Sequence, residues 1–304
     1  MFQSSNFGAD PLTDVLEVLG ARVTRRTRLE AGGQWSLSFP DLERLKFVAV
    51  MNGSVWMCLP GQAPLWMQAG DVCLIGRTTY VVTSDPALPP LDGQRFFGVN
   101  DDVHLGGDEV VALGGSVTFK DEAAQFLLNM LPDFMIVRAG DAGSDVISTI
   151  LRLMSDEVER QQMGHRIVSS RLADVLLVEA IRAYAKLTEP AGPGWLGALI
   201  DPRIGRTLAA LHADIAQPWT IARLAHVAGM SRAAFAAEFT HRLGRPPMSY
   251  LRSWRLTVAH AALSQKDAAS VADIAFSVGY CSQSAFSQAF RRAYGITPKS
   301  TLRP

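Results

Sequence analysis

The sequence predicts a chain of the α+β class, with an N-terminal β-barrel that carries a helical segment and an all-α domain after it. Short, half-alternating apolar segments recur roughly every 8–12 residues in the first part of the chain, which is typical of a small antiparallel sandwich or barrel. From Val146 onward the apolar residues recur at helical spacing, and everything after Trp195 keeps that spacing. The change of period indicates two domains.

The composition limits the class of protein. At roughly 150 residues per domain, 304 residues allow about two domains, and 48% hydrophobic with 19% charged residues is typical of a globular chain. No apolar run approaches the ~18 residues that cross a bilayer, and Met1–Asn6 lack the regions of a signal peptide. The cysteines Cys58, Cys73 and Cys281 are odd in number and widely spaced, which excludes a disulfide framework or a paired zinc site. We therefore expect a cytoplasmic protein without a membrane segment.

The charge is divided unequally along the chain. Residues 1–199 hold 16 Lys and Arg against 24 Asp and Glu, whereas residues 200–304 hold 13 against 5. A basic domain following an acidic one is expected when one end meets a polyanion such as DNA. Chance and an ordinary solvated surface would also account for the charge alone.

The first half of the chain contains one short helix and a series of strands. The helix begins after Asp10, with Pro11 in its first turn, and ends at Gly20. The predicted strands are Gln34–Phe39, Lys46–Met51, Ser54–Leu59, Leu65–Gln68, Asp71–Ile75 and Tyr80–Thr83. The polar stretch Asn100–Glu109 predicts a loop, and strands resume near Gly115–Phe119.

Two amphipathic helices follow the strands. Val146, Ile150, Leu153 and Met154 share one helical face, and a longer amphipathic helix covers Ile167–Ile181. These helices can pack on the barrel or pair across a homodimer. Prolines and glycines in 188–194 end the helical structure, so the predicted domains are 1–190 and 195–304.

The second domain contains an internal repeat. Ile221–Pro247 aligns with Val271–Pro298, and each copy consists of a short helix, a turn with Gly, and a second helix that begins at Ser. This pattern predicts two helix-turn-helix motifs, at about 220–244 and 271–295, joined by a linker helix at about 247–263.

The second helix of each motif is the candidate DNA reader. Its apolar face is buried, and the opposite face and N-terminal tip are left for base edges and phosphates. The candidate DNA-contacting residues are Ser231, Arg232, Ala233, Ala236, Ala237, Thr240, Ser282, Gln283, Ser284, Ser287, Gln288, Arg291 and Arg292.

The C-terminal domain resembles the DNA-binding domain of AraC/XylS-type bacterial transcription regulators. The resemblance is carried by Val278–Tyr280, Ser282, Phe286-Ser287, Phe290–Arg292 and Thr297-Pro298. The first domain is similar to the cupin-like ligand-binding domain of one AraC-type subgroup, through Asp10–Leu16, Leu45–Phe47 and Ala69–Asp71. The resemblance implies a transcription regulator, an activator or a repressor, that binds double-stranded DNA, responds to a small-molecule effector, contacts RNA polymerase and can form a homodimer.

The sequence departs from this family in its first reading helix. The exposed face there is alanine-rich, and Glu238 adds a negative charge. Small side chains can touch a thymine methyl group but cannot form bidentate contacts. We therefore expect the first motif to contact phosphates, through Arg232 and through Arg242 or Arg245, and the second motif to read the sequence.

The predicted effector site is aromatic and free of metal. Related regulators often carry histidines where this chain has Val48 and Tyr80, and His104 stands alone in the predicted loop as a surface residue. We therefore expect no metal and no cofactor. The candidate effector-binding residues are Val48, Trp56, Trp66 and Tyr80.

An enzyme is the alternative. The chain has no GxSxG, Walker A, GxGxxG or HExxH motif, so a regulator is favoured over a cupin-type enzyme with a helical assembly domain. A regulator whose sensor has degenerated and acts through protein contacts also fits the sequence.

Overall fold

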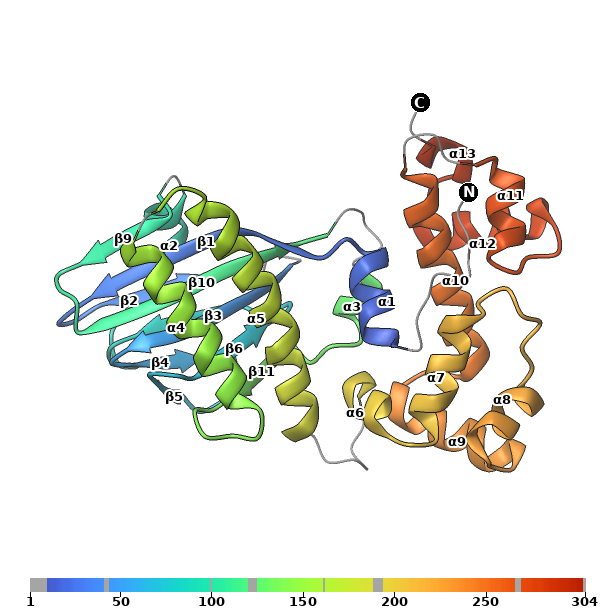
Figure 1. Ribbon diagram of the computed structural model, residues 1–304, viewed down its shortest axis with the longest axis horizontal. Helices are drawn as coiled ribbons and strands as arrows, with labels where there is room; N and C mark the ends of the chain where they lie inside the picture. Colours follow the sequence, from blue (N-terminus) through green and yellow to red (C-terminus); the bar gives the residue numbers. More distant parts are fainter. Residues whose placement is uncertain are drawn as a thin grey trace. The chain divides into compact units, whose positions relative to one another are not determined.

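The computed structural model describes residues 10–40, 44–98, 100–119, 125–160, 162–187, 194–265 and 269–302. They fold into two compact units (Figure 1). The sheet unit comprises Arg22–Thr118 and Pro132–Leu187, and the helical unit comprises Met1–Ala21, Phe119–Leu131 and Thr188–Pro304. The predicted order of sheets first and helices afterwards is observed for most of the chain, with two exceptions, one near its start and one near its middle.

Two sheets form the framework of the sheet unit. Their strands are β1 (Arg22–Ala31), β2 (Ser36–Phe39), β3 (Leu45–Asn52), β4 (Ser54–Cys58), β5 (Leu65–Gln68), β6 (Val72–Ile75), β7 (Tyr80–Thr83), β8 (Leu91–Asp92), β9 (Asp102–Leu105), β10 (Val110–Thr118) and β11 (Phe134–Val137). One sheet has the order β11-β6-β3-β10-β1-β9 and the other β5-β4-β7-β2-β8. Neighbouring strands are antiparallel except for the pairs β1/β9 and β2/β8. Buried apolar side chains from both sheets form one core.

Helices complete the sheet unit. The short helix α2 (Gly93–Phe97) follows β8, and α4 (Ser144–Arg160) and α5 (His165–Leu187) follow β11. The pair α4 and α5 packs on the six-stranded sheet, through contacts with β1, β3, β6 and β11 (Figure 1). Asp174 on α5 accepts a hydrogen bond from the backbone N–H of Val23 on β1, at 2.8 Å. Of the two packing modes open to these helices, packing on the sheet is therefore observed.

The helical unit is built around a long central helix. Its elements are α1 (Pro11–Val18), α3 (Gln125–Leu128), α6 (Trp195–Ile200), α7 (Ile204–Ala213), α8 (Ile221–Ala228), α9 (Arg232–Leu243), α10 (Pro247–Leu263), α11 (Val271–Ser277), α12 (Gln283–Tyr294) and α13 (Pro298–Thr301). The side chains of Tyr250 and Trp254 on α10 are fully buried. None of the helices in the described ranges has the length and apolarity that crossing a bilayer requires.

Segments from the start and middle of the chain belong to this helical unit. Helix α1 packs on α7 and α10, and α3 packs on α10. Phe126 of α3 lies against the rings of Tyr250 and Trp254, with centroid distances of 5.7 and 5.4 Å. Residues 10–21 and 125–131 thus lie in the predicted domain 1–190 by sequence but in the helical unit by packing. The predicted break at 188–194 falls almost entirely outside the described residues.

Several predicted elements differ from the observed ones. Strand β9 occupies part of the predicted loop Asn100–Glu109, because its backbone pairs in parallel with β1. His104 therefore lies on a strand and not in a loop, although it is exposed, and its Nδ1 is 2.8 Å from Glu30 Oε2. Strand β10 begins five residues before the predicted Gly115, and β1 and β11 were not predicted.

Candidate functional site

The first candidate reading helix, α9, is positioned by side-chain caps and a glycine turn. The Thr220 hydroxyl accepts a hydrogen bond from the Arg223 N–H at 3.2 Å, and the Ser231 hydroxyl accepts one from the Ala234 N–H at 3.3 Å. Between them, Gly229 ends α8 at φ +67°, a left-handed conformation that glycine adopts without steric cost. These bonds satisfy N–H groups that a helix start would otherwise leave unpaired. The sequence therefore fixes where α9 begins.

The second candidate reading helix, α12, repeats the arrangement. Ser270 caps α11 by accepting from the Asp273 N–H at 3.1 Å, and Ser282 caps α12 by accepting from the Ala285 N–H at 3.2 Å. The turn between them contains Gly279 at φ +85°. Phe286 on α12 is fully buried, as is its counterpart Phe235 on α9. The two helix pairs therefore anchor their second helices in the same way.

A half-buried arginine connects the two pairs. Arg255 on α10 donates hydrogen bonds to the carbonyls of Ile215 at 2.9 Å and Gln217 at 2.8 Å, on the segment that leads into α8. It also donates to the carbonyl of Gly279 at 3.1 Å, in the turn before α12. Burial lowers the pKa of Arg255, and each of its three nitrogens donates to one of these carbonyls. Sequence analysis did not identify this residue, because its partners are backbone atoms distant in sequence.

The predicted contacts on α12 share one surface. Gln283, Ser284, Gln288 and Arg291 are exposed and Ser287 is half-buried. All five line a shallow hollow with Val271, Thr297, Pro298 and Lys299. Ser282 is the capping residue, and Arg292 is exposed but does not line the hollow. Lys299 is a cation at this surface that sequence analysis missed, since it lies beyond the second repeat.

The predicted DNA-contacting residues on α9 differ in how exposed their side chains are. Ser231, Arg232, Ala233 and Ala237 are exposed, whereas Ala236 and Thr240 are half-buried. The Thr240 hydroxyl donates a hydrogen bond to the carbonyl of Ala236 at 2.7 Å, so its hydrogen already has an acceptor within the helix. The exposed face of α9 therefore offers Arg232 and small side chains.

Arg242 does not lie on this exposed face. Its guanidinium is buried and forms ion pairs with Asp201 at 3.1 Å and Glu238 at 2.5 Å. The expectation that Arg242 serves as a phosphate contact is therefore wrong, and Arg232 and Arg245 are left. The ion pair with Arg242 offsets part of the negative charge of Glu238 near α9.

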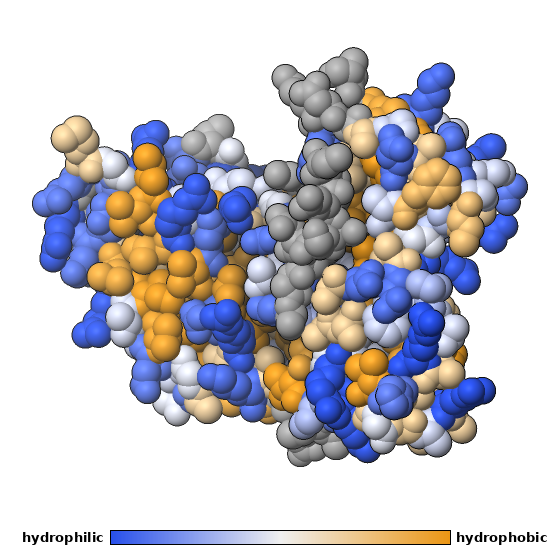
Figure 2. All heavy atoms as spheres, turned by 45° about the vertical axis from the view of Figure 1, so that its right-hand side comes forward, coloured by the Kyte–Doolittle hydropathy of each residue, from blue (hydrophilic) through white to orange (hydrophobic). Residues whose placement is uncertain are grey.

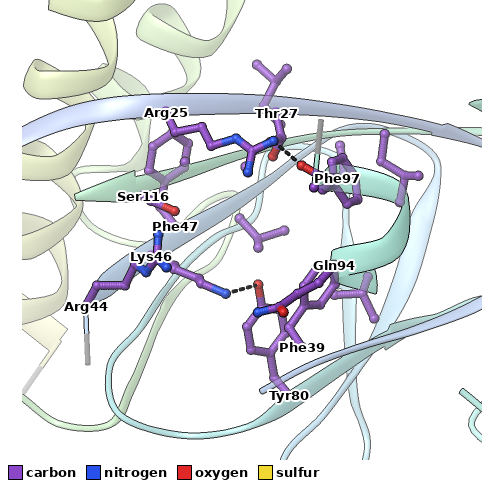
Figure 3. Close-up of a pocket in the computed structure, with 18 residues that line it drawn as sticks. Arg25, Thr27, Phe39, Arg44, Lys46, Phe47, Tyr80, Gln94, Phe97 and Ser116 are labelled. Carbon is purple, nitrogen blue, oxygen red and sulfur yellow. Dashed lines mark hydrogen bonds between the residues drawn. The ribbon is translucent and has the colours of Figure 1, made fainter. Parts of the chain in front are cut away.

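A cavity of about 280 Å³ lies in the sheet unit (Figure 3). It is lined by Arg25, Thr27, Leu29, Phe39, Arg44, Lys46, Phe47, Val48, Tyr80, Val82, Gln94, Phe97, Gly98, Ala112, Leu113, Gly114, Gly115 and Ser116. Phe39 and Tyr80 stack with their ring centroids 4.9 Å apart. Burial raises the pKa of Tyr80, so its hydroxyl stays protonated. Val48 and Tyr80 thus line the cavity, as expected of effector-binding residues.

The two predicted tryptophans lie elsewhere. Trp56 on β4 and Trp66 on β5 pack edge to face on neighbouring strands, with centroids 4.9 Å apart, and Trp66 is exposed. Neither lines the cavity. Their side chains point to the other face of the sheet, because residues alternate between faces along a strand. We therefore omit both from the effector site.

In the described part of the chain, residues of the types that bind metal ions do not gather at one place. Within it, no three His, Cys, Asp or Glu side chains cluster closely enough to hold a metal ion. Cys73 is buried in the sheet unit, and burial raises its pKa to about 12.

These features define a class: DNA-binding proteins that also carry a ligand-sized cavity. Comparison with known proteins agrees. Residues 10–186 match the family described as Cupin, and residues 224–304 match the family described as Helix-turn-helix domain. A putative AraC-like transcription regulator of Streptomyces lividans is 35% identical over 95% of this chain and 96% of its own length. One from Streptomyces antibioticus is 36% identical over 95% and 97%.

A solved structure is also similar to about a third of the chain. The AraC-type transcriptional regulator from Chromobacterium violaceum is 28% identical, covers 33% of this chain and 88% of that one, and has a TM-score of 0.31. The chain belongs to the family of AraC-like transcription regulators. Its function is DNA-binding transcription regulation with a cupin ligand-binding domain, as the resemblance predicted.

Proposed function

We propose that this regulator reads DNA through two helix-turn-helix motifs, α8/α9 and α11/α12, in the predicted domain 195–304. The observation that carries the proposal is the hollow on α12, where Gln283, Gln288, Arg291 and Lys299 meet on one exposed surface. Amides suit the edge of an adenine, and the cations suit phosphates. Ser282, which caps this helix, sets the direction in which its N-terminal end enters the major groove.

The two motifs make different contacts: α12 reads base edges, and α9 mainly contacts a phosphate and thymine methyl groups. On α12 the paired hydrogen bonds of a glutamine amide to adenine discriminate by about 1–3 kcal/mol against the wrong base. On α9 the alanines supply apolar contact with thymine methyl groups, and Arg232 at the exposed start of the helix anchors a phosphate. Arg242 is unavailable because its charge is paired inside the unit.

The helix α10 sets the distance between the two readers. Its 17 residues form a rod about 25 Å long, and Arg255 bonds to the segments before α8 and before α12. Two reading helices held this way enter major-groove sites about one turn, ~34 Å, apart on one side of the duplex. A footprint of about 20 base pairs per chain is expected.

The sheet unit is the effector-binding part of the proposed domain 1–190. The effector occupies the cavity lined by Val48 and Tyr80 and shifts the balance between conformations of different DNA affinity. In this scheme the regulator acts in the cytoplasm and contacts RNA polymerase, as an activator or a repressor.

A homodimer is part of the proposal. Val146 and Leu153 on α4, and Ile167, Val168 and Val175 on α5, are large apolar residues that are exposed. They recur at about two helical turns along each helix, and Figure 2 shows apolar side chains gathered on one face of the sheet unit. An apolar stripe of this kind is typical of a protein contact surface.

The test uses the full-length protein. Genomic fragments are selected by binding, and the enriched site is measured against single-base variants at two salt concentrations. Gln288→Ala should lose preference at one base position, whereas Arg232→Ala should weaken all sites alike and lower the salt slope by about one. Arg206→Ala is the matched control, because Arg206 is exposed in the same unit but outside α9 and α12.

The alternatives predict other results. If Arg232→Ala relaxes preference at one base while Gln288→Ala weakens binding evenly, the roles of the two helices are reversed. A footprint of a single half-site contradicts use of both motifs. Absence of salt-dependent DNA binding would favour the cupin-type enzyme with a helical assembly domain.

A further inference from the structure

The two helix-turn-helix pairs of the helical unit touch each other beside the middle of α10. Figure 1 shows α10 passing between α8/α9 and α11/α12. The segment 215–217, which leads into α8, lies against the turn that contains Gly279 and precedes α12. A Cβ added at residue 279 would lie 2.7 Å from the carbonyl oxygen of Ala216, which is closer than such atoms approach. The contact between the pairs therefore requires glycine at this position.

Arg255 fastens this contact from the middle of α10. Its Nε donates to the carbonyl of Ile215 at 2.9 Å, and its Nη2 donates to that of Gln217 at 2.8 Å. Its Nη1 donates to the carbonyl of Gly279 at 3.1 Å. Because a guanidinium is a rigid, planar fork, one side chain fixes the position of the segment before α8 relative to the turn before α12.

The segment before α8 is itself ordered by hydrogen bonds. The Asp214 carboxylate accepts from the N–H of Gln217 at 3.1 Å, and the Asp214 carbonyl accepts from the indole N–H of Trp219 at 2.8 Å. The next residue, Thr220, caps α8. The position that Arg255 gives to this segment is therefore passed on to the first helix-turn-helix pair.

The internal repeat provides a comparison for Gly279. Its counterpart is Gly229, which ends α8, and both residues have positive φ, +85° and +67°. A Cβ added at Gly229 would have nothing within 4 Å, whereas one added at Gly279 would also lie 2.6 Å from Arg255 Nη2. The turn explains the glycine at both positions, and the contact between the pairs is a second requirement at Gly279.

A contact of this kind sets the rotation of one pair relative to the other. The length of α10 limits the distance between the pairs, but the angle between them about the helix axis also depends on contacts beside it. One base pair moves a half-site by about 3.4 Å along the duplex and by about 35° around it. Two reading helices held at one distance and one angle therefore fit one spacing of half-sites.

We propose that Arg255 and Gly279 determine the spacing between half-sites that this regulator accepts. They hold the two motifs as one rigid reader, so that sites with one base pair more or fewer between their halves are rejected. The inference rests on the proposed function, in which both motifs read DNA, and it adds a specificity that no base contact provides. Arg255 is half-buried and bonded to three carbonyls, so it acts as a positioning residue.

The test measures binding of the full-length protein to a series of DNA duplexes by fluorescence anisotropy. The site selected from genomic DNA is altered by removing one base pair, adding one or adding two between its half-sites. The wild-type protein should bind the original spacing about tenfold or more tightly than the others, since a motif out of register loses several base contacts. A further duplex keeps only the half-site of α12.

Arg255→Lys tests the fork without removing its charge. A lysine has one nitrogen and cannot reach three separate carbonyls, so the preference for the original spacing should fall to about threefold or less. Binding to the single half-site should stay at the wild-type value, because α12 keeps its own cap. Arg252→Lys is the matched control, since Arg252 lies about one turn earlier on α10 and is exposed; it should keep the wild-type preference.

Two glycine variants separate the contact from the turn. Gly279→Ala and Gly229→Ala both place a Cβ at positive φ, but only the first pushes against Arg255 and Ala216. Gly279→Ala should therefore relax the spacing preference, and Gly229→Ala should weaken binding to all spacings alike.

Three results overturn the proposal. The first is a wild-type spacing preference in Arg255→Lys. The second is an equal loss of binding by Arg255→Lys to the single half-site and to the full site, which assigns Arg255 to stability alone. The third is equal relaxation by Gly229→Ala and Gly279→Ala.

The wild-type protein separates this inference from the proposed function. If it binds one half-site as tightly as two, the proposed use of both motifs is contradicted, and the inference with it. If it requires both half-sites but accepts every spacing equally, only the inference is contradicted.

Discussion

Phe126→Ala should destabilise the helical unit, although Phe126 lies in sequence between two strands of the sheet unit. Its side chain is 7% exposed and packs on Tyr250 and Trp254 of α10. Removal of a buried phenyl ring leaves a cavity and costs about 3–5 kcal/mol. Because a domain is stable by only about 5–15 kcal/mol, this loss is a large fraction of the stability of the unit that carries the DNA-reading helices.

Hydrogen exchange in the full-length protein measures this effect unit by unit. Amides of α7 and α10 that exchange by opening of the unit should do so about two to four orders of magnitude faster in Phe126→Ala, since ~1.4 kcal/mol corresponds to a factor of ten. The matched control is Phe97→Ala, because Phe97 is 8% exposed and belongs to the sheet unit. It should increase exchange in the strands and leave α10 protected.

The opposite pattern would refute the reasoning. If Phe126→Ala increases exchange in β10 and β11 and leaves α7 and α10 unchanged, α3 is a part of the sheet unit. DNA affinity gives a second readout, because loosening of α10 should weaken binding to the selected site in Phe126→Ala and not in the control.

Three further predictions concern stability. Burial lowers the pKa of His212, whose Nδ1 is 3.4 Å from Asp14 Oδ2. His212 therefore binds a proton more readily in the unfolded chain than in the folded protein. The free energy of unfolding should decrease as pH falls below about 6.5, the pKa of histidine in the unfolded chain. Denaturant unfolding at pH 8 and pH 5.5 checks this, and equal values contradict it. Gly279→Ala should lower the free energy of unfolding by at least about 2 kcal/mol, because φ is +85° and an added Cβ would lie 2.6 Å from Arg255 Nη2. Gly295→Ala is the control, since φ is +71° there and an added Cβ would have nothing within 4 Å. Thermal unfolding should show a smaller loss of stability for Gly295→Ala than for Gly279→Ala. Elemental analysis should find no stoichiometric transition metal, and a chelator should leave the melting temperature unchanged; about one metal ion per chain would contradict both expectations.

Local signals in the sequence were sufficient for the DNA-reading helices. Ser231 and Ser282 cap their helices and Gly229 ends one, and each of these roles depends on residues only a few positions away. The buried phenylalanines repeat at helical spacing, so the face left exposed could be deduced. Arg242 was misassigned because its partner Asp201 lies far from it in sequence.

The sheet unit was harder to predict. Strand β1 contains four arginines, and its middle residues are half-buried, so it lacks the alternation that identified other strands. Strand β9 is paired in parallel with β1, and its four residues, two of them polar, are too few to show a clear alternation. The cavity draws its lining from both sheets, and no short stretch of sequence shows which side chains meet. Val48 and Tyr80 were found through the family resemblance, whereas Lys46 was not.

The interleaving of the two units matters for anyone who builds a hybrid regulator. A single cut near residue 190 would transfer α6 to α13 to a new sensor but leave α1 and α3 behind. The transferred helices α7 and α10 would then expose the apolar surface around Trp254 that α1 and α3 cover. The remaining sensor would carry two helices with no matching partner. A functional exchange of DNA specificity therefore requires three transplanted segments, or else replacement of only the reading faces of α9 and α12 on the native scaffold.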